Sequence, residues 1–228
     1  MLRNKRVVIA FYGIDGSGKT TLAKLLANLF KAKRMNVYVI RLRAHHTFMY
    51  VLIRLVLLVK GYDYNLLRGK PLHLNYIVKK YFGDKILYVT LEIVSVLIWF
   101  IIEFFPQKIL QRSDTVFIAD RFVPDFIVML RYTSYLNEQT LLKLAKVLEK
   151  FMYINPVYFH IYVDPHKAII RKKEEKLHPL FVIYLSAKYQ WISKYLEHVT
   201  IDTTNKKPLE LMTQVLDYLD YRKEARCI

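Results

Sequence analysis

The sequence predicts an α/β protein, because short apolar strands alternate with helical patterns along its 228 residues. Five such strands are rich in β-branched and aromatic residues, and they are continuous apolar runs rather than alternating ones. Such runs are typical of a parallel sheet that is buried on both faces. We therefore expect a three-layer architecture, with helices on both sides of a five-stranded parallel sheet and right-handed crossovers.

The strands follow one another in a regular order. The first precedes a glycine-rich loop, after which leucines recur at helical spacing, and the last three each end at an aspartate. The five predicted strands are Val7–Phe11, Asn36–Ile40, Val116–Ala119 before Asp120, Val157–Val163 before Asp164, and Val199–Ile201 before Asp202.

A long helical segment, residues 47–112, separates the second and third strands. Its last part, residues 86–105, reads ILYVTLEIVSVLIWFIIEFF. A membrane span needs about 20 apolar residues, but the carboxylates of Glu92 and Glu103 would be costly inside a bilayer. These two residues and Ser95 fall roughly on one helical face. We expect a buried or interface helix rather than a span; an integral membrane protein is not expected, and peripheral membrane contact stays open.

The chain is strongly basic, with 36 Lys+Arg against 19 Asp+Glu and a formal net charge of +17. Such an excess attracts polyanions: nucleotides, nucleic acid or acidic membranes. The charges are scattered in short clusters, which also fits a generally basic surface. No recognisable nucleic-acid-binding motif is present, so a nucleic-acid partner is not expected.

Length and composition suit one compact domain over residues 1–228, because 54% of the residues are hydrophobic. The single cysteine, Cys227, cannot form an internal disulfide. We recognise no signal peptide in the basic N-terminus, and we expect a cytoplasmic protein.

The segment Gly13–Thr20 matches the P-loop pattern G-x-x-x-x-G-K-[ST], with a strand before it and a helix starting inside it. Glycines let the backbone curl around phosphates, and the helix N-terminus favours anions. Lys19 would reach the β- and γ-phosphates of ATP, and the Thr20 hydroxyl would ligate Mg²⁺. The predicted ATP-binding residues here are Gly13, Asp15, Gly16, Ser17, Gly18, Lys19, Thr20 and Thr21.

Asp120 and Arg121 form the second candidate site, at the carboxyl end of the third strand. Ligands of doubly wound sheets bind at this edge. There Asp120 would hold Mg²⁺ opposite the P-loop, and Arg121 would grip a second phosphate. A purely structural ion pair at the end of a strand is the alternative.

These residues resemble the thymidylate kinase family of P-loop nucleoside monophosphate kinases. The resemblance covers both ends of the chain and leaves out the middle. It is carried by the loop Phe11–Thr21, by Asp120-Arg121-Phe122, by the strand between Asn155-Pro156 and Asp164-Pro165, by Arg171-Lys172-Lys173, and by Ile201–Thr204.

The resemblance implies a three-layer P-loop kinase fold, a homodimer, and transfer of the γ-phosphoryl group of ATP to dTMP. On the acceptor side it implies that Asp15 binds the 3′-hydroxyl of the sugar. Arg121 would bind the acceptor phosphate, with Phe122 beside it, and Asp120 would organise Mg²⁺.

On the donor side the resemblance implies that Thr203 lies by the adenine and that residues 165–178 form a lid. The P-loop has no arginine, so the lid must supply the catalytic cation. Arg171 is the first choice for that cation, with Lys172 and Lys173 as alternatives.

The middle of the chain departs from the family pattern. Arg43 is the candidate for the acceptor-phosphate arginine, although the Pro-Gly part of the usual Arg-Glu-Pro-Gly turn is missing. The helix expected to hold thymine has no arginine, and Pro124-Asp125 replaces the usual serine. The adjacent His45 and His46 have poor metal-ligand geometry.

Two alternatives stay open: a kinase of the same fold for a nucleoside or a membrane-associated alcohol, and a non-enzymatic NTP-binding module.

Overall fold

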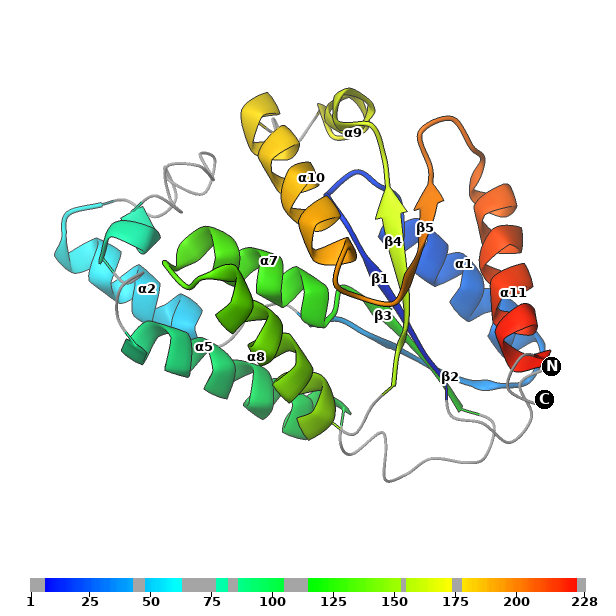
Figure 1. The fold of residues 1–228 in the computed structure, drawn as a ribbon, viewed down its shortest axis with the longest axis horizontal. Helices are drawn as coiled ribbons and strands as arrows, with labels where there is room; N and C mark the ends of the chain where they lie inside the picture. The colour runs from blue at the N-terminus through cyan, green and yellow to red at the C-terminus, as the bar shows by residue number, and fades with distance from the viewer. Residues whose placement is uncertain are drawn as a thin grey trace.

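A computed structural model describes residues 7–42, 48–62, 77–81, 86–104, 115–152, 155–173 and 178–224. Within these residues five parallel strands form one sheet in the order β2-β3-β1-β4-β5 (Figure 1). The strands are β1 (Val7–Tyr12), β2 (Asn36–Ile40), β3 (Thr115–Asp120), β4 (Val157–Tyr162) and β5 (His198–Asp202). The predicted five-stranded parallel sheet is confirmed, and each strand overlaps its predicted range.

Helices cover both faces of the sheet, as the predicted three layers require (Figure 1). Successive residues of β1 point to opposite layers, because side chains alternate along a strand. Ile9 and Phe11 pack with α1 and α11, whereas Ala10 and Tyr12 pack with α7 and α10. The helices that flank the sheet are α1 (Lys19–Ala32), α7 (Val123–Thr133), α8 (Glu138–Phe151), α9 (Pro165–Arg171), α10 (Pro179–Ser193) and α11 (Pro208–Glu224).

The helices between β2 and β3 lie at the end of the molecule opposite α11 (Figure 1). They include α2 (Phe48–Val59), α5 (Ile86–Trp99) and the continuation of α5 as one π-helical turn, η2 (Phe100–Phe104), and residues 77–81 are also helical. The aromatic ring of Phe100 packs edge-on against that of Phe151 in α8. No helix in the described part of the chain is long and apolar enough to cross a membrane.

Helix α5 has the polar face that the sequence predicts, and this face points inward. Glu92 and Ser95 are buried, with 1% and 2% of their surface exposed, while Leu87, Val94 and Ile98 are exposed. Water-soluble helices ordinarily bury the apolar stripe and expose the polar one. Burial raises the pKa of Glu92 to about 7, opposed by the Tyr88 hydroxyl. The interior face of α5 therefore holds a carboxyl group that is easily protonated.

Candidate active site

The P-loop runs from the end of β1 into α1, and its backbone requires glycine. Gly13 and Gly16 have φ angles of 143° and 85°, which side chains rarely adopt. A Cβ atom at Gly13 would lie 2.4 Å from the carbonyl oxygen of Ile161, and one at Gly16 would lie 2.9 Å from that of Ala168. Close approach of β4 and α9 to the loop therefore fixes both glycines. At Gly18, where no atom lies near, the φ angle of 91° is the reason.

The ammonium group of Lys19 lies inside the loop. It donates hydrogen bonds to the carbonyl oxygens of Gly13 (2.7 Å) and Ile14 (2.6 Å) and to the Ser17 hydroxyl (3.3 Å). Burial, together with the nearby Arg121, lowers the pKa of Lys19 to about 8. A phosphate group beside Lys19 would raise this pKa, because a nearby negative charge favours the protonated amine.

Thr20 and Asp120 meet across the edge of the sheet, as expected of a Mg²⁺ site. The Thr20 hydroxyl donates to Oδ2 of Asp120 at 2.8 Å. Oδ1 of Asp120 is buried and has no hydrogen-bond partner among the described residues. A hydroxyl beside a carboxylate oxygen that lacks a donor suits a hard cation, which takes oxygen ligands and keeps several waters. The residues present therefore fit Mg²⁺.

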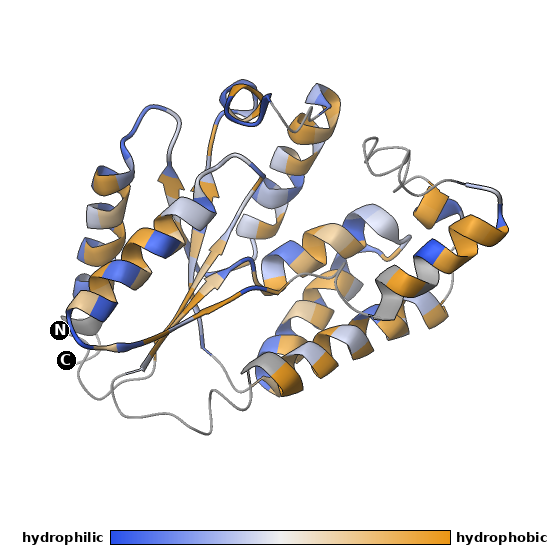
Figure 2. Ribbon diagram, turned by 180° about the vertical axis from the view of Figure 1, so that it is seen from behind, coloured by the Kyte–Doolittle hydropathy of each residue, from blue (hydrophilic) through white to orange (hydrophobic). Residues whose placement is uncertain are grey.

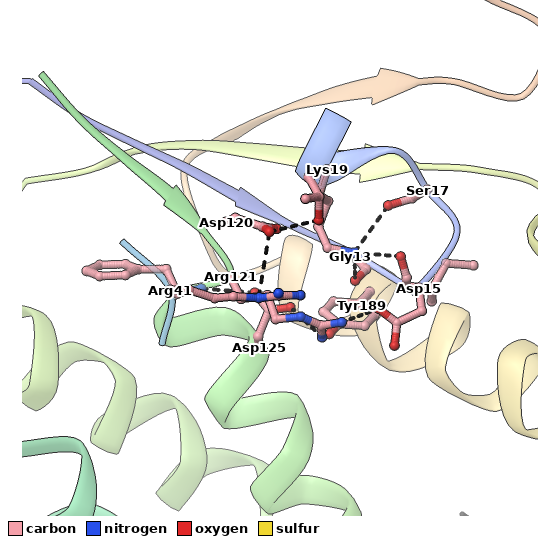
Figure 3. Close-up of polar contacts among 12 residues, drawn as sticks. Gly13, Asp15, Ser17, Lys19, Arg41, Asp120, Arg121, Asp125 and Tyr189 are labelled. Atoms are coloured by element: carbon pink, nitrogen blue, oxygen red, sulfur yellow. Dashed lines mark hydrogen bonds and ion pairs between the residues drawn. The ribbon is translucent and has the colours of Figure 1, made fainter. Parts of the chain in front are cut away.

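Arg121 adopts a strained backbone conformation directly after Asp120. Its φ angle is 83°, and its amide donates to the carbonyl oxygen of Phe11 (3.1 Å). Its guanidinium binds the carboxylate of Asp15 in the P-loop and lies 3.7 Å from Oδ1 of Asp125 (Figure 3). Strain of this kind persists where the surrounding structure holds it, often at functional sites. The ion pair brings together Asp15 and Arg121, the two residues that the sequence assigns to the acceptor.

Asp125 and Tyr189 form a hydrogen-bonded pair beside Arg121, and neither was predicted from the sequence as a site residue. The Tyr189 hydroxyl in α10 donates to Oδ1 of Asp125 (2.8 Å), and the amide of Phe122 donates to Oδ2 (3.1 Å). Burial raises the pKa of Asp125, against the lowering effect of Arg121. In the sequence, Asp125 is marked only by its departure from the family pattern, and no signal points to Tyr189.

Arg41 is a further cation of the site that the sequence analysis missed. Its Nε atom lies 3.6 Å from Oδ2 of Asp120, just beyond the end of β2. Arg43, the residue that the sequence predicts for this role, lies two residues later and outside the described residues, as do His45 and His46. The signal was available, because Arg41 is the first residue after the predicted strand.

The predicted lid arginine lies against the predicted adenine loop. The Arg171 guanidinium donates to the carbonyl oxygens of Thr203 (2.6 Å), Thr204 (3.2 Å) and Gly16 (3.3 Å). The Thr203 hydroxyl contacts the carbonyl oxygen of Ser17 (2.9 Å). Arg171 thus joins α9, the P-loop and the segment after β5.

A cavity of about 510 Å³ lies along the P-loop, Arg41 and Arg171, and neither Asp120 nor Arg121 is among its lining residues. It is large enough for a small-molecule ligand. Phe122, by contrast, is 1% exposed and packs in the hydrophobic core. The cavity is lined by Asp15, Gly16, Ser17, Gly18, Lys19, Thr20, Thr21, Leu22, Arg41, Arg171, Lys172, Thr203, Lys206, Pro208 and Leu211.

No protein-family model and no curated protein sequence matches the chain. Solved structures do match it over nearly their whole length. Thymidylate kinase from Ehrlichia chaffeensis has a TM-score of 0.55 and 20% identity, covering 94% of this chain and 98% of that one. Deoxyadenosine kinase from M. mycoides with bound dATP has a TM-score of 0.52 and 14% identity, covering 94% and 99%. The same kinase with dCMP and dCDP has a TM-score of 0.53 and 12% identity, covering 94% and 100%. The chain therefore has the P-loop kinase fold that these structures share.

Proposed function

We propose that the chain is an ATP- and Mg²⁺-dependent phosphotransferase of the thymidylate kinase type. It transfers the γ-phosphoryl group of ATP to a (deoxy)nucleoside monophosphate, with dTMP as the first acceptor to test. The observation that carries this proposal is the convergence of a P-loop, Thr20 and Asp120 at 2.8 Å, and Arg121 against Asp15 at one edge of the sheet.

Charge and position account for the chemistry, because phosphoryl transfer needs alignment and charge stabilisation more than covalent help. Lys19 would hold the β- and γ-phosphates inside the loop. Thr20 and Asp120 would hold Mg²⁺, which when bound neutralises charge on the phosphates. Arg171 reaches the carbonyl oxygen of Gly16 at 3.3 Å and is the lid cation for the transferring group.

The acceptor side supports a substrate that carries a phosphate. Arg41 lies against Asp120 at the carboxyl end of β3, and Arg121, the next residue, lies against Asp15 of the P-loop. Two guanidinium groups at one site suit bidentate recognition of phosphate oxygens. Asp15, beside Arg121, would accept a hydrogen bond from the acceptor sugar.

A nucleoside acceptor is the second candidate. It is favoured by the similarity to deoxyadenosine kinase, which covers this chain as fully as the similarity to thymidylate kinase does. A nucleoside would receive the phosphoryl group on a sugar hydroxyl, whereas a monophosphate receives it on a phosphate oxygen. Only transfer to a monophosphate needs cations that bind the acceptor phosphate.

An ADP-release assay with ATP and Mg²⁺ tests the proposal against dTMP, the other nucleoside monophosphates, the nucleosides and long-chain alcohols. We expect the highest turnover with a monophosphate and no turnover for Lys19→Ala. Turnover with nucleosides alone would replace the monophosphate proposal with the second candidate. Turnover with none of these acceptors, together with ATP binding, would favour an NTP-binding module.

A further inference from the structure

Exposed apolar side chains gather on α2, α5 and η2, and we call this set the apolar face. Along α5 and η2 they recur at helical spacing, so they form one stripe. No charged residue interrupts the exposed side of α5, since its one charged residue, Glu92, is buried. The apolar face consists of Val51, Leu55, Leu58, Val59, Ile86, Leu87, Val94, Ile98, Ile101 and Ile102.

The inward orientation of the polar side of α5 makes this face unusual. A helix in contact only with water and a protein core would expose Glu92 and Ser95 and bury Leu87 and Ile98. The structure does the opposite. Large contiguous apolar patches on soluble proteins mark interaction surfaces. The partner of α5 must therefore be apolar itself.

Two cationic residues, Arg54 and Lys60, belong to or directly follow α2, which carries part of the apolar face. Arg54 is exposed within α2 itself. Lys60 and Lys80 both lie over the ring of Tyr81, at 5.9 and 5.8 Å from its centroid, and Lys79 lies 4.4 Å from the ring centroid of Tyr135. Interfacial helices combine the same two features, apolar side chains for the acyl region and Lys or Arg for the headgroups.

We propose that the apolar face docks on the surface of an anionic lipid bilayer. Such a surface matches both features, because its interior is apolar and its headgroups attract a chain of net charge +17. A second copy of the chain would match the first feature but would bring like charges together along the rim of the face. The sequence predicts a homodimer through residues 86–105. This stays a prediction, and the experiment below distinguishes it from docking on a bilayer.

The experiment is sedimentation of the full chain with phosphatidylcholine vesicles that contain or lack phosphatidylglycerol. We expect binding to the anionic vesicles and roughly tenfold weaker binding for each of Leu58→Gln and Leu87→Gln, because each leucine contributes apolar area to the bilayer. Leu209→Gln in α11 is the matched control, since Leu209 and Leu87 are 64% and 65% exposed. The control should bind like the unaltered chain.

Thermal unfolding and light scattering accompany each variant, so that loss of folding is not mistaken for loss of binding. Absence of binding to anionic vesicles would overturn the proposal. Equal binding by the unaltered chain and both face variants would overturn it too, because net charge alone would then explain the attraction. A dimer that the variants dissociate without weaker vesicle binding would assign the face to a second copy.

Discussion

The two sides of the molecule bury polar groups in opposite ways. On the nucleotide side, Lys19 is buried but donates to two carbonyl oxygens, and Asp120 accepts from Thr20. On the helical side, Glu92 is buried in α5, where burial raises the pKa of its carboxyl group against the effect of the Tyr88 hydroxyl. The two sides also differ in hydropathy, and Figure 2 shows hydrophobic residues along much of α2 and α5. We infer that the nucleotide side suits anionic ligands, whereas the helical side suits apolar surroundings.

Asp120→Asn should have the largest effect, because it removes a negative charge from the predicted Mg²⁺ site while keeping the side-chain shape. We expect turnover to fall by about a thousandfold or more, with the melting temperature within a few degrees of the unaltered chain. Steady-state ADP release measures this. Asp217→Asn, an exposed aspartate of α11, is the control. Turnover preserved in Asp120→Asn would remove the carboxylate from the mechanism.

Arg171→Ala comes next and tests what the lid arginine does. If its cation stabilises the transferring phosphoryl group, turnover should fall by about a hundredfold with a smaller change in ATP affinity. Its bonds to Thr203 and Thr204 allow another result, in which ATP affinity falls and turnover does not. Turnover and ATP titration, with exposed Lys167→Ala of the same helix as control, separate the two roles.

Much of the nucleotide side follows from local sequence. Parallel strands align their carboxyl ends, so a P-loop after β1 and an aspartate ending β3 must face the same crevice. Tyr189 could not be found this way, because it lies 64 residues from Asp125 and only packing of α10 on α7 brings them together. The orientation of α5 was equally hidden. Periodicity tells which residues share a face but not which face meets the core.

Tyr189→Phe tests whether Asp125 positions Arg121. Without the tyrosine hydroxyl, Oδ1 of Asp125 loses its 2.8 Å donor and can shift relative to the guanidinium. We expect about a tenfold rise in KM for the acceptor, with KM for ATP unchanged. Tyr184→Phe in the same helix is the matched control. Equal changes in both KM values would indicate general loosening of α10 instead of a specific effect on Arg121.

Glu92 tests directly whether the helical side buries its polar groups differently from the nucleotide side. Burial raises its pKa from about 4.5 to about 7, so the unfolded chain loses this proton first as the pH rises. The contribution of Glu92 to stability should therefore fall from about pH 4.5 to about pH 7 and then level off. Glu92→Gln removes this titration, and its stability relative to the unaltered chain should increase across that range by about 3 kcal/mol, because one pKa unit corresponds to about 1.4 kcal/mol.

Urea unfolding of both proteins at several pH values measures this difference, and Glu210→Gln on the surface of α11 serves as the control. A difference that does not change with pH would mean that Glu92 keeps its charge inside the fold. The helical side would then bury a stabilised anion, much as the P-loop buries the Lys19 cation. A difference that grows as predicted would show that α5 tolerates its inward polar face by keeping the acid neutral. Its outward face would then be left apolar for a partner.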